Sequence, residues 1–101
     1  MTRTAAELGP SLRRQARDRW SHVKTAERNE PGHHVWRFRT GSGGEEFFLH
    51  IEHGAMVQGR NPAGALLERL TQGSWLDRLQ EQAGAALLLS RDGQLVPLAG
   101  R

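Results

Sequence analysis

The chain contains no cysteine among its 101 residues. This absence excludes disulfide bonds, a cysteine nucleophile and every metal site that is built on thiolates, and it is consistent with a reducing compartment. Tyrosine is absent as well, so the aromatic residues are three Trp and three Phe.

Long apolar segments are also lacking. No apolar run approaches the roughly 20 residues that a membrane-spanning helix needs, and the first ten residues, MTRTAAELGP, lack the apolar core of a signal peptide. We therefore expect a cytoplasmic protein that does not bind membranes.

Charge is unevenly distributed along the chain, whose formal net charge is +3. Residues 1–40 carry nine Lys/Arg and four Asp/Glu, a balance of +5, whereas residues 41–101 carry five and seven, a balance of −2. This asymmetry indicates either that the basic part binds a polyanion or that the two parts contact each other.

The length and the 37% hydrophobic content are typical of one small globular domain. Residues 1–10 are expected to be a loose N-terminal end, and residues 11–101 a single compact domain. Ser11 is predicted to cap a helix that runs to about Arg28, where Asn29–Gly32 would end it. The apolar residues of this helix recur at helical spacing and are Leu12, Ala16, Trp20 and Val23.

Residues 33–53 are predicted to form a β-hairpin with Ser42-Gly43 as its two-residue loop. In this register the pairs on the apolar face are Phe38 with Phe47, Trp36 with Leu49, and His34 with Ile51. The pairs on the other face are Arg39 with Glu46, Arg37 with Phe48, and Val35 with His50. A shift of one residue would place charged side chains on both faces, so the pattern favours this register.

The C-terminal part is predicted to contain two short helices and a second hairpin. Asn61-Pro62 starts the first helix, and a break at Gly73 separates the two because a continuous helix would split its apolar residues between two faces. Residues 85–89 suit a central strand, and Pro97 places the returning strand at a sheet edge. The expected fold class is α+β: an N-terminal helix, a hairpin, two short helices and a hairpin. We expect a four-stranded, mainly antiparallel sheet with the helices packed on it.

No pattern in the sequence indicates catalysis or a cofactor. A Walker A loop, a dinucleotide fingerprint and a nucleophile elbow are all missing, and the carboxylates lie outside the apolar stripes. His33, His50 and Glu52 share one strand face and form a weak three-ligand candidate, but we favour the interpretation as surface residues. The chain is therefore predicted not to be an enzyme, and no metal or cofactor is assigned.

Two surfaces are candidates for binding. The first is the basic side of the predicted N-terminal helix, which would follow a nucleic-acid backbone; its residues are Arg13, Arg14, Arg17, Lys24 and Arg28. The alternative is that these residues are simply the solvated side of an amphipathic helix.

The second candidate is Phe48, which stands with Arg37 and His50 on the polar face of the first hairpin. Aromatic and arginine residues dominate protein interfaces, so this set predicts a protein-interaction surface. The alternative is that the N-terminal helix covers this face and buries Phe48 against Trp20. We expect a non-enzymatic binding or protein-interaction module, with a homodimer as one form of it, and a nucleic-acid-binding domain as the alternative.

Overall fold

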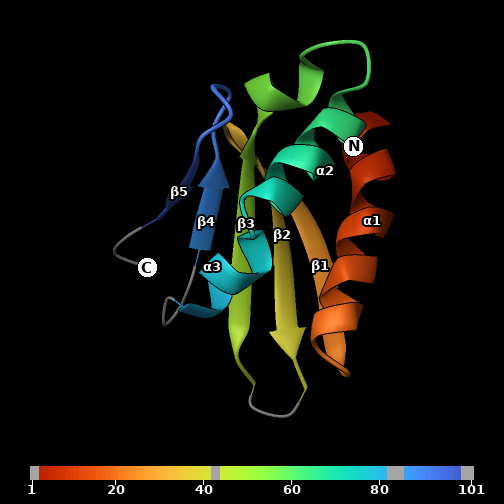
Figure 1. Ribbon diagram of the computed structural model, residues 1–101, viewed down its shortest axis with the longest axis vertical. Helices are drawn as coiled ribbons and strands as arrows, with labels where there is room; N and C mark the ends of the chain where they lie inside the picture. The colour runs from red at the N-terminus through yellow and green to blue at the C-terminus, as the bar shows by residue number, and fades with distance from the viewer. Residues whose placement is uncertain (1–2, 42–43, 82–85, 99–101) are drawn as a thin grey trace.

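The computed structural model describes residues 3–41, 44–81 and 86–98, which form an α+β fold with three α-helices packed on one face of a five-stranded mixed sheet (Figure 1). The helices are α1 (Arg3–Arg19), α2 (Pro62–Gln72) and α3 (Trp75–Glu81), with a short 3-10 helix, η1 (His53–Val57). The strands are β1 (Val23–Glu30), β2 (His33–Thr40), β3 (Glu46–Glu52), β4 (Ala86–Leu89) and β5 (Leu95–Pro97).

The strands lie in the order β1-β2-β3-β4-β5. All neighbouring pairs are antiparallel except β3 and β4, which are parallel. A parallel pair needs a crossover connection, and η1, α2 and α3 supply it. The α+β class is confirmed, but the expected four-stranded sheet is wrong because the described sheet has a fifth strand, β1.

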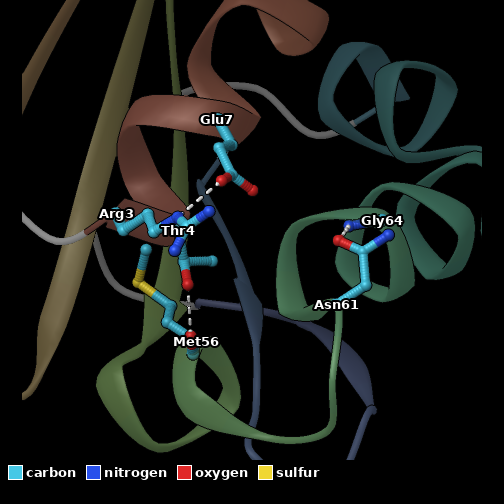
Figure 2. Close-up of polar contacts among 6 residues, drawn as sticks. All are labelled: Arg3, Thr4, Glu7, Met56, Asn61 and Gly64. Carbon is cyan, nitrogen blue, oxygen red and sulfur yellow. Dashed lines mark hydrogen bonds and ion pairs between the residues drawn. The ribbon is translucent and has the colours of Figure 1, made fainter.

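The first helix begins earlier than predicted, at Arg3 instead of Ser11. Residues 3–10 are thus not a loose end, because Ala5 and Leu8 are completely buried in the core. The hydroxyl of Thr4 also donates a hydrogen bond of 2.6 Å to the carbonyl oxygen of Met56, which ties the first turn of α1 to η1 (Figure 2). Gly9-Pro10 therefore lies inside the helix instead of closing a loop.

The first helix also ends earlier than predicted, at Arg19 instead of near Arg28. Residues 23–30 form β1, which pairs with β2 along its whole length, from Val23 opposite Thr40 to Glu30 opposite His33. Without β1, the backbone of β2 would be an unpaired sheet edge, so strand pairing outweighs the helical spacing of Trp20 and Val23. The two strands are joined at Pro31-Gly32, where Gly32 has a φ of 84°.

The predicted register of the β2–β3 hairpin is confirmed. Phe38 lies opposite Phe47, Trp36 opposite Leu49 and Arg37 opposite Phe48. The pairing continues to the loop end, where the backbone amide of Thr40 donates to the carbonyl of Glu45 at 2.9 Å. The predicted loop residues Ser42-Gly43 lie outside the described residues.

The helix pair and the second hairpin also agree with the prediction. Asn61 caps α2 by accepting a hydrogen bond of 3.2 Å from the amide of Gly64, as Figure 2 shows, and Pro62 is the first helical residue. The chain then breaks at Gly73, and α3 starts at Trp75 after Ser74, whose φ is positive. Pro97 lies in β5 at the sheet edge, where its missing amide donor costs no sheet hydrogen bond.

The core lies between the helices and one face of the sheet. The helices contribute Ala5, Leu8, Leu12, Ala16, Ala63, Leu66, Leu70, Trp75 and Leu79. The strands contribute Trp36, Phe38, Phe47, Leu49, Ile51, Leu87 and Leu89. In the described residues no helix is long and apolar enough to cross a membrane.

Candidate interaction surface

The sheet has a second face that no helix of the described chain covers, because α1, α2 and α3 all lie on the opposite side (Figure 1). Side chains alternate between the two faces along a strand. The pairing registers therefore assign to this helix-free face Lys24, Ala26, Arg28, Glu30, His33, Val35, Arg37, Arg39, Glu46, Phe48, His50, Glu52, Ala86, Leu88 and Val96.

The residues of the helix-free face form four rows that cross the strands. The two central rows contain its apolar side chains: Ala26, Arg37, Phe48 and Ala86 in one, and Arg28, Val35, His50, Leu88 and Val96 in the other. The two end rows contain only charged residues and a histidine: Lys24, Arg39 and Glu46 at one end, and Glu30, His33 and Glu52 at the other. An apolar centre between charged ends is the usual arrangement of a protein interface.

The centre of the helix-free face is partly shielded from water. Val35 is 3% exposed and Ala86 is 2% exposed, although neither belongs to the core beneath the helices. Phe48 and Leu88 are half-buried beside them, and Val96 is 37% exposed. This part of the sheet therefore carries apolar side chains that the helices do not use.

A hollow of about 290 Å³ opens on this face next to Phe48. Its lining comes from the first three strands: Ala26, Glu27, Arg28, Val35, Arg37, Glu46 and Phe48. Three of these residues are apolar and four are charged, so the hollow suits a partner side chain that carries both apolar and polar groups.

Charges around the hollow are mostly compensated. Arg37 Nε lies 3.6 Å from Glu46 Oε2, and Arg28 forms an ion pair with Glu30. Lys24 and Arg39, in contrast, lie directly opposite each other, and neither has an ion pair within the described residues. Like charges in opposite positions are unfavourable, so this end of the face favours a ligand that brings negative charge.

The predicted interaction residues lie on one surface, as expected. Phe48 is directly opposite Arg37, and His50 is the next residue along β3 on the same face. His50 itself is only 4% exposed, and its ring packs edge-on against His33 with the centroids 5.4 Å apart. Phe48 and Arg37 are therefore the members of this set that a partner can reach.

The weak histidine set does not form a metal site. His33 lies opposite Glu52, and His50 lies one row away. No group of three or more His, Cys, Asp or Glu side chains in the described parts of the chain could hold a metal ion.

The predicted basic helix face does not exist as one surface. Arg14 and Arg17 are exposed on α1, whereas Arg13 bends toward the sheet, where its guanidinium lies 3.9 Å from the carboxylate of Glu27. Lys24 and Arg28 lie on β1, on the helix-free face. The prediction was wrong because it continued the helical periodicity of residues 12–19 into a segment that forms a strand.

The alternative for Phe48 is also wrong, because α1 packs on the other face of the sheet. Trp20 stacks on Phe47 and not on Phe48, with ring centroids 5.1 Å apart. Phe48 is therefore left without a helix above it among the described residues.

Sequence reasoning missed that Lys24 and Arg28 share a surface with Arg37 and Phe48. Two signals could have revealed it. Pro31-Gly32 is a turn signal between two segments of similar length, and Val23 and Thr25 are β-branched residues two positions apart.

Known protein families, characterised proteins and solved structures were compared with the chain, and none of them matches it.

Proposed function

We propose that this chain is a protein-interaction module that binds its partner through the helix-free face. The observation that carries the proposal is the position of Phe48, half-buried and opposite Arg37 at the centre of a sheet face that no described helix covers. A partner that packs there would remove the remaining apolar surface of Phe48, Leu88 and Val96 from water. Burial of apolar surface is the main driving force of most protein association.

The chemistry around Phe48 also supports binding over catalysis. Glu46, which lines the same hollow as Phe48, forms an ion pair with Arg37, and Glu30 forms one with Arg28. The imidazole of His50 is buried. The ion-paired Glu46 and Glu30 are suited to orient a partner, and none of these three groups is both accessible and free to exchange a proton with a substrate.

The proposal is tested by affinity capture from lysate of the source cells, with immobilised wild-type protein and two variants. Phe48→Glu places a charge at the centre of the helix-free face. Val57→Glu is the matched control, because Val57 is 72% exposed on η1 and lies outside this face. Proteins retained by the wild type and by V57E but lost with F48E would support the proposal. Equal retention by all three folded proteins would contradict it.

Nucleic-acid binding remains the second candidate function, but the surface proposed for it is now on the sheet instead of on α1. The observation that favours it is the Lys24–Arg39 pair, which lacks carboxylate partners among the described residues and shares a face with Phe48. Basic side chains beside an aromatic ring can hold a single strand.

This second candidate is tested by fluorescence anisotropy with labelled single-stranded and duplex oligonucleotides at several salt concentrations. It predicts micromolar binding that weakens steeply with salt and is lost in Lys24→Glu but kept in Arg17→Glu. Absence of binding at low salt would exclude it.

A further inference from the structure

We propose that the partner on the helix-free face is a second copy of this chain, and that two copies pack their sheets face to face around a two-fold axis. The inference rests on the proposed function, because it names the occupant of the same surface. Three properties of the face support it: the charges of its two ends, the position of its apolar rows, and its area.

The two ends of the helix-free face carry opposite net charge. The row next to the β2–β3 loop contains Lys24 and Arg39 against one carboxylate, Glu46. The row at the other end contains two carboxylates, Glu30 and Glu52, on either side of His33. One end is thus basic and the other is acidic.

Consider a two-fold axis that lies in the plane between the two sheets and runs across the strands. Such an axis would bring ends of opposite net charge together. It reverses the strand direction of one copy relative to the other, so each basic end row lies over the acidic end row of the second copy. Lys24 then faces Glu30 of the second copy, and by symmetry the contact forms twice. Lys24 gains a carboxylate that it lacks among the described residues of one copy, whereas Arg39 lies over His33 and Glu46 over Glu52 of the second copy. The charge match at each end therefore depends on the Lys24–Glu30 contact and on the opposite net charge of the two rows.

The same operation brings the apolar rows together. The row that contains Phe48 lies over the row of the second copy that contains Val35 and Leu88. The half-buried ring of Phe48 is then placed near the centre of the interface, where anchoring aromatic residues contribute most. One arrangement therefore brings the apolar rows together at the centre and rows of opposite net charge together at the ends.

The area of the face is sufficient for a modest interface. Two strands of eight residues, one of seven and two short ones give roughly 500 Å² of sheet per copy at the usual rise and spacing, or about 1,000 Å² for both. This is close to the lower limit of specific interfaces, so the dimer is expected to dissociate in the micromolar range.

The first experiment measures the mass of the purified full chain by sedimentation velocity over a wide concentration range. The wild type is expected to change from monomer to dimer with increasing concentration. Phe48→Glu is expected to weaken the dimer by about thirtyfold or more. Arg17→Glu, a charge reversal at an exposed position of α1, is expected to leave it unchanged.

The second experiment is a charge exchange that only an interface can rescue. Lys24→Glu and Glu30→Lys are each expected to weaken the dimer by about tenfold, and the double variant is expected to recover most of the wild-type affinity. The two residues are six positions apart on one strand, about 20 Å. This exceeds the screening length of about 8 Å at physiological salt, so recovery cannot come from within one copy.

The outcomes distinguish failure of the dimer inference from failure of the proposed function. A wild type that stays monomeric at every concentration, or a dimer that F48E and K24E leave intact, would overturn the inference. If the monomer still retains other proteins from lysate through Phe48, a different protein is the occupant and the proposed function stands. If it retains none, both fail. A monomer that binds an oligonucleotide through Lys24 would assign the face to nucleic acid.

Discussion

Trp20 stacks on Phe47, with the two ring centroids 5.1 Å apart and the ring planes inclined by 7°. Trp20 follows the last residue of α1, and Phe47 lies near the start of β3. The contact places α1 on the same face of the sheet as α2 and α3. Phe48, the next residue of β3, points to the opposite face, so the Trp20–Phe47 pair determines that Phe48 is left uncovered by α1.

Replacement of Trp20 by Ala is expected to destabilise the fold by about 2 kcal/mol, because the half-buried indole loses its stacking partner and part of its buried area. Trp20→Phe keeps an aromatic ring and is expected to cost less. Denaturant unfolding followed by circular dichroism measures both. A Trp20→Ala protein as stable as the wild type would contradict the packing of α1 through this residue.

Replacement of Leu8 by Ala tests whether the N-terminal segment belongs to the core. Leu8 is 1% exposed, so its truncation is expected to cost about 2–5 kcal/mol. Ala6→Ser, at an exposed position of the same helix, is the control and is expected to change stability by less than about 0.5 kcal/mol. If Leu8→Ala were neutral in thermal unfolding, residues 3–10 would behave as a loose end after all.

Two buried tryptophans differ in their hydrogen bonding, and this difference can be measured. Trp36 and Trp75 are each 1% exposed. Trp75 Nε1 donates to Gln15 Oε1 at 2.9 Å, whereas Trp36 Nε1 has no acceptor among the described residues. Replacement by Phe removes a satisfied donor at Trp75 and an unsatisfied one at Trp36. Trp75→Phe is therefore expected to cost about 1 kcal/mol more than Trp36→Phe.

The same unfolding assay compares the two variants. An equal or larger loss for Trp36→Phe would show that the indole N–H of Trp36 has an acceptor in solution, such as a buried water molecule. Trp36→Ala, which removes the whole ring, is expected to cost about 3–5 kcal/mol in either case.

Alanine substitutions at two glycines test two different features: the strained backbone of the β1–β2 turn and the break between α2 and α3. Gly32 has a φ of 84° in the β1–β2 turn, so Gly32→Ala is expected to cost about 1–2 kcal/mol. Gly73 has a φ of −83°, which Ala can adopt, but an added Cβ would lie 3.1 Å from Leu95 and 3.2 Å from the carbonyl of Arg69. Gly73→Ala is therefore expected to change stability by less than about 1 kcal/mol. Strong stabilisation at Gly73 would indicate that α2 and α3 can join.

The parts of the fold that follow from short-range patterns were predictable. The β2–β3 register was predictable, because period-two alternation leaves only one pairing that buries Trp36, Phe38 and Leu49 together. The cap at Asn61 and the break at Gly73 were also predictable, because a side-chain cap and the division of apolar residues act within a few positions. The bounds of α1 were not, since Leu12, Ala16 and Trp20 have a helical spacing that says nothing about what pairs with β2.

The candidate surface was predictable only in part. Arg37 and Phe48 could be placed on one face from the hairpin alone. The addition of Lys24 and Arg28 to that face required knowledge that residues 23–30 form a strand. Whether a helix covers Phe48 was an open alternative in the sequence, because an amphipathic helix can dock on either face of a sheet.

The amino-acid sequence by itself therefore determined the α+β class, the register of β2 with β3, the helix break at Gly73 and the edge position of Pro97. Each depends on side-chain period, turn chemistry or a missing amide donor, which act between neighbours in the chain. Only the tertiary structure decided that residues 23–30 form a strand, that α1 packs over Phe47, and that none of the described helices covers the Phe48 face. Those features depend on which arrangement of distant segments buries the most apolar surface. No short stretch of residues specifies that arrangement.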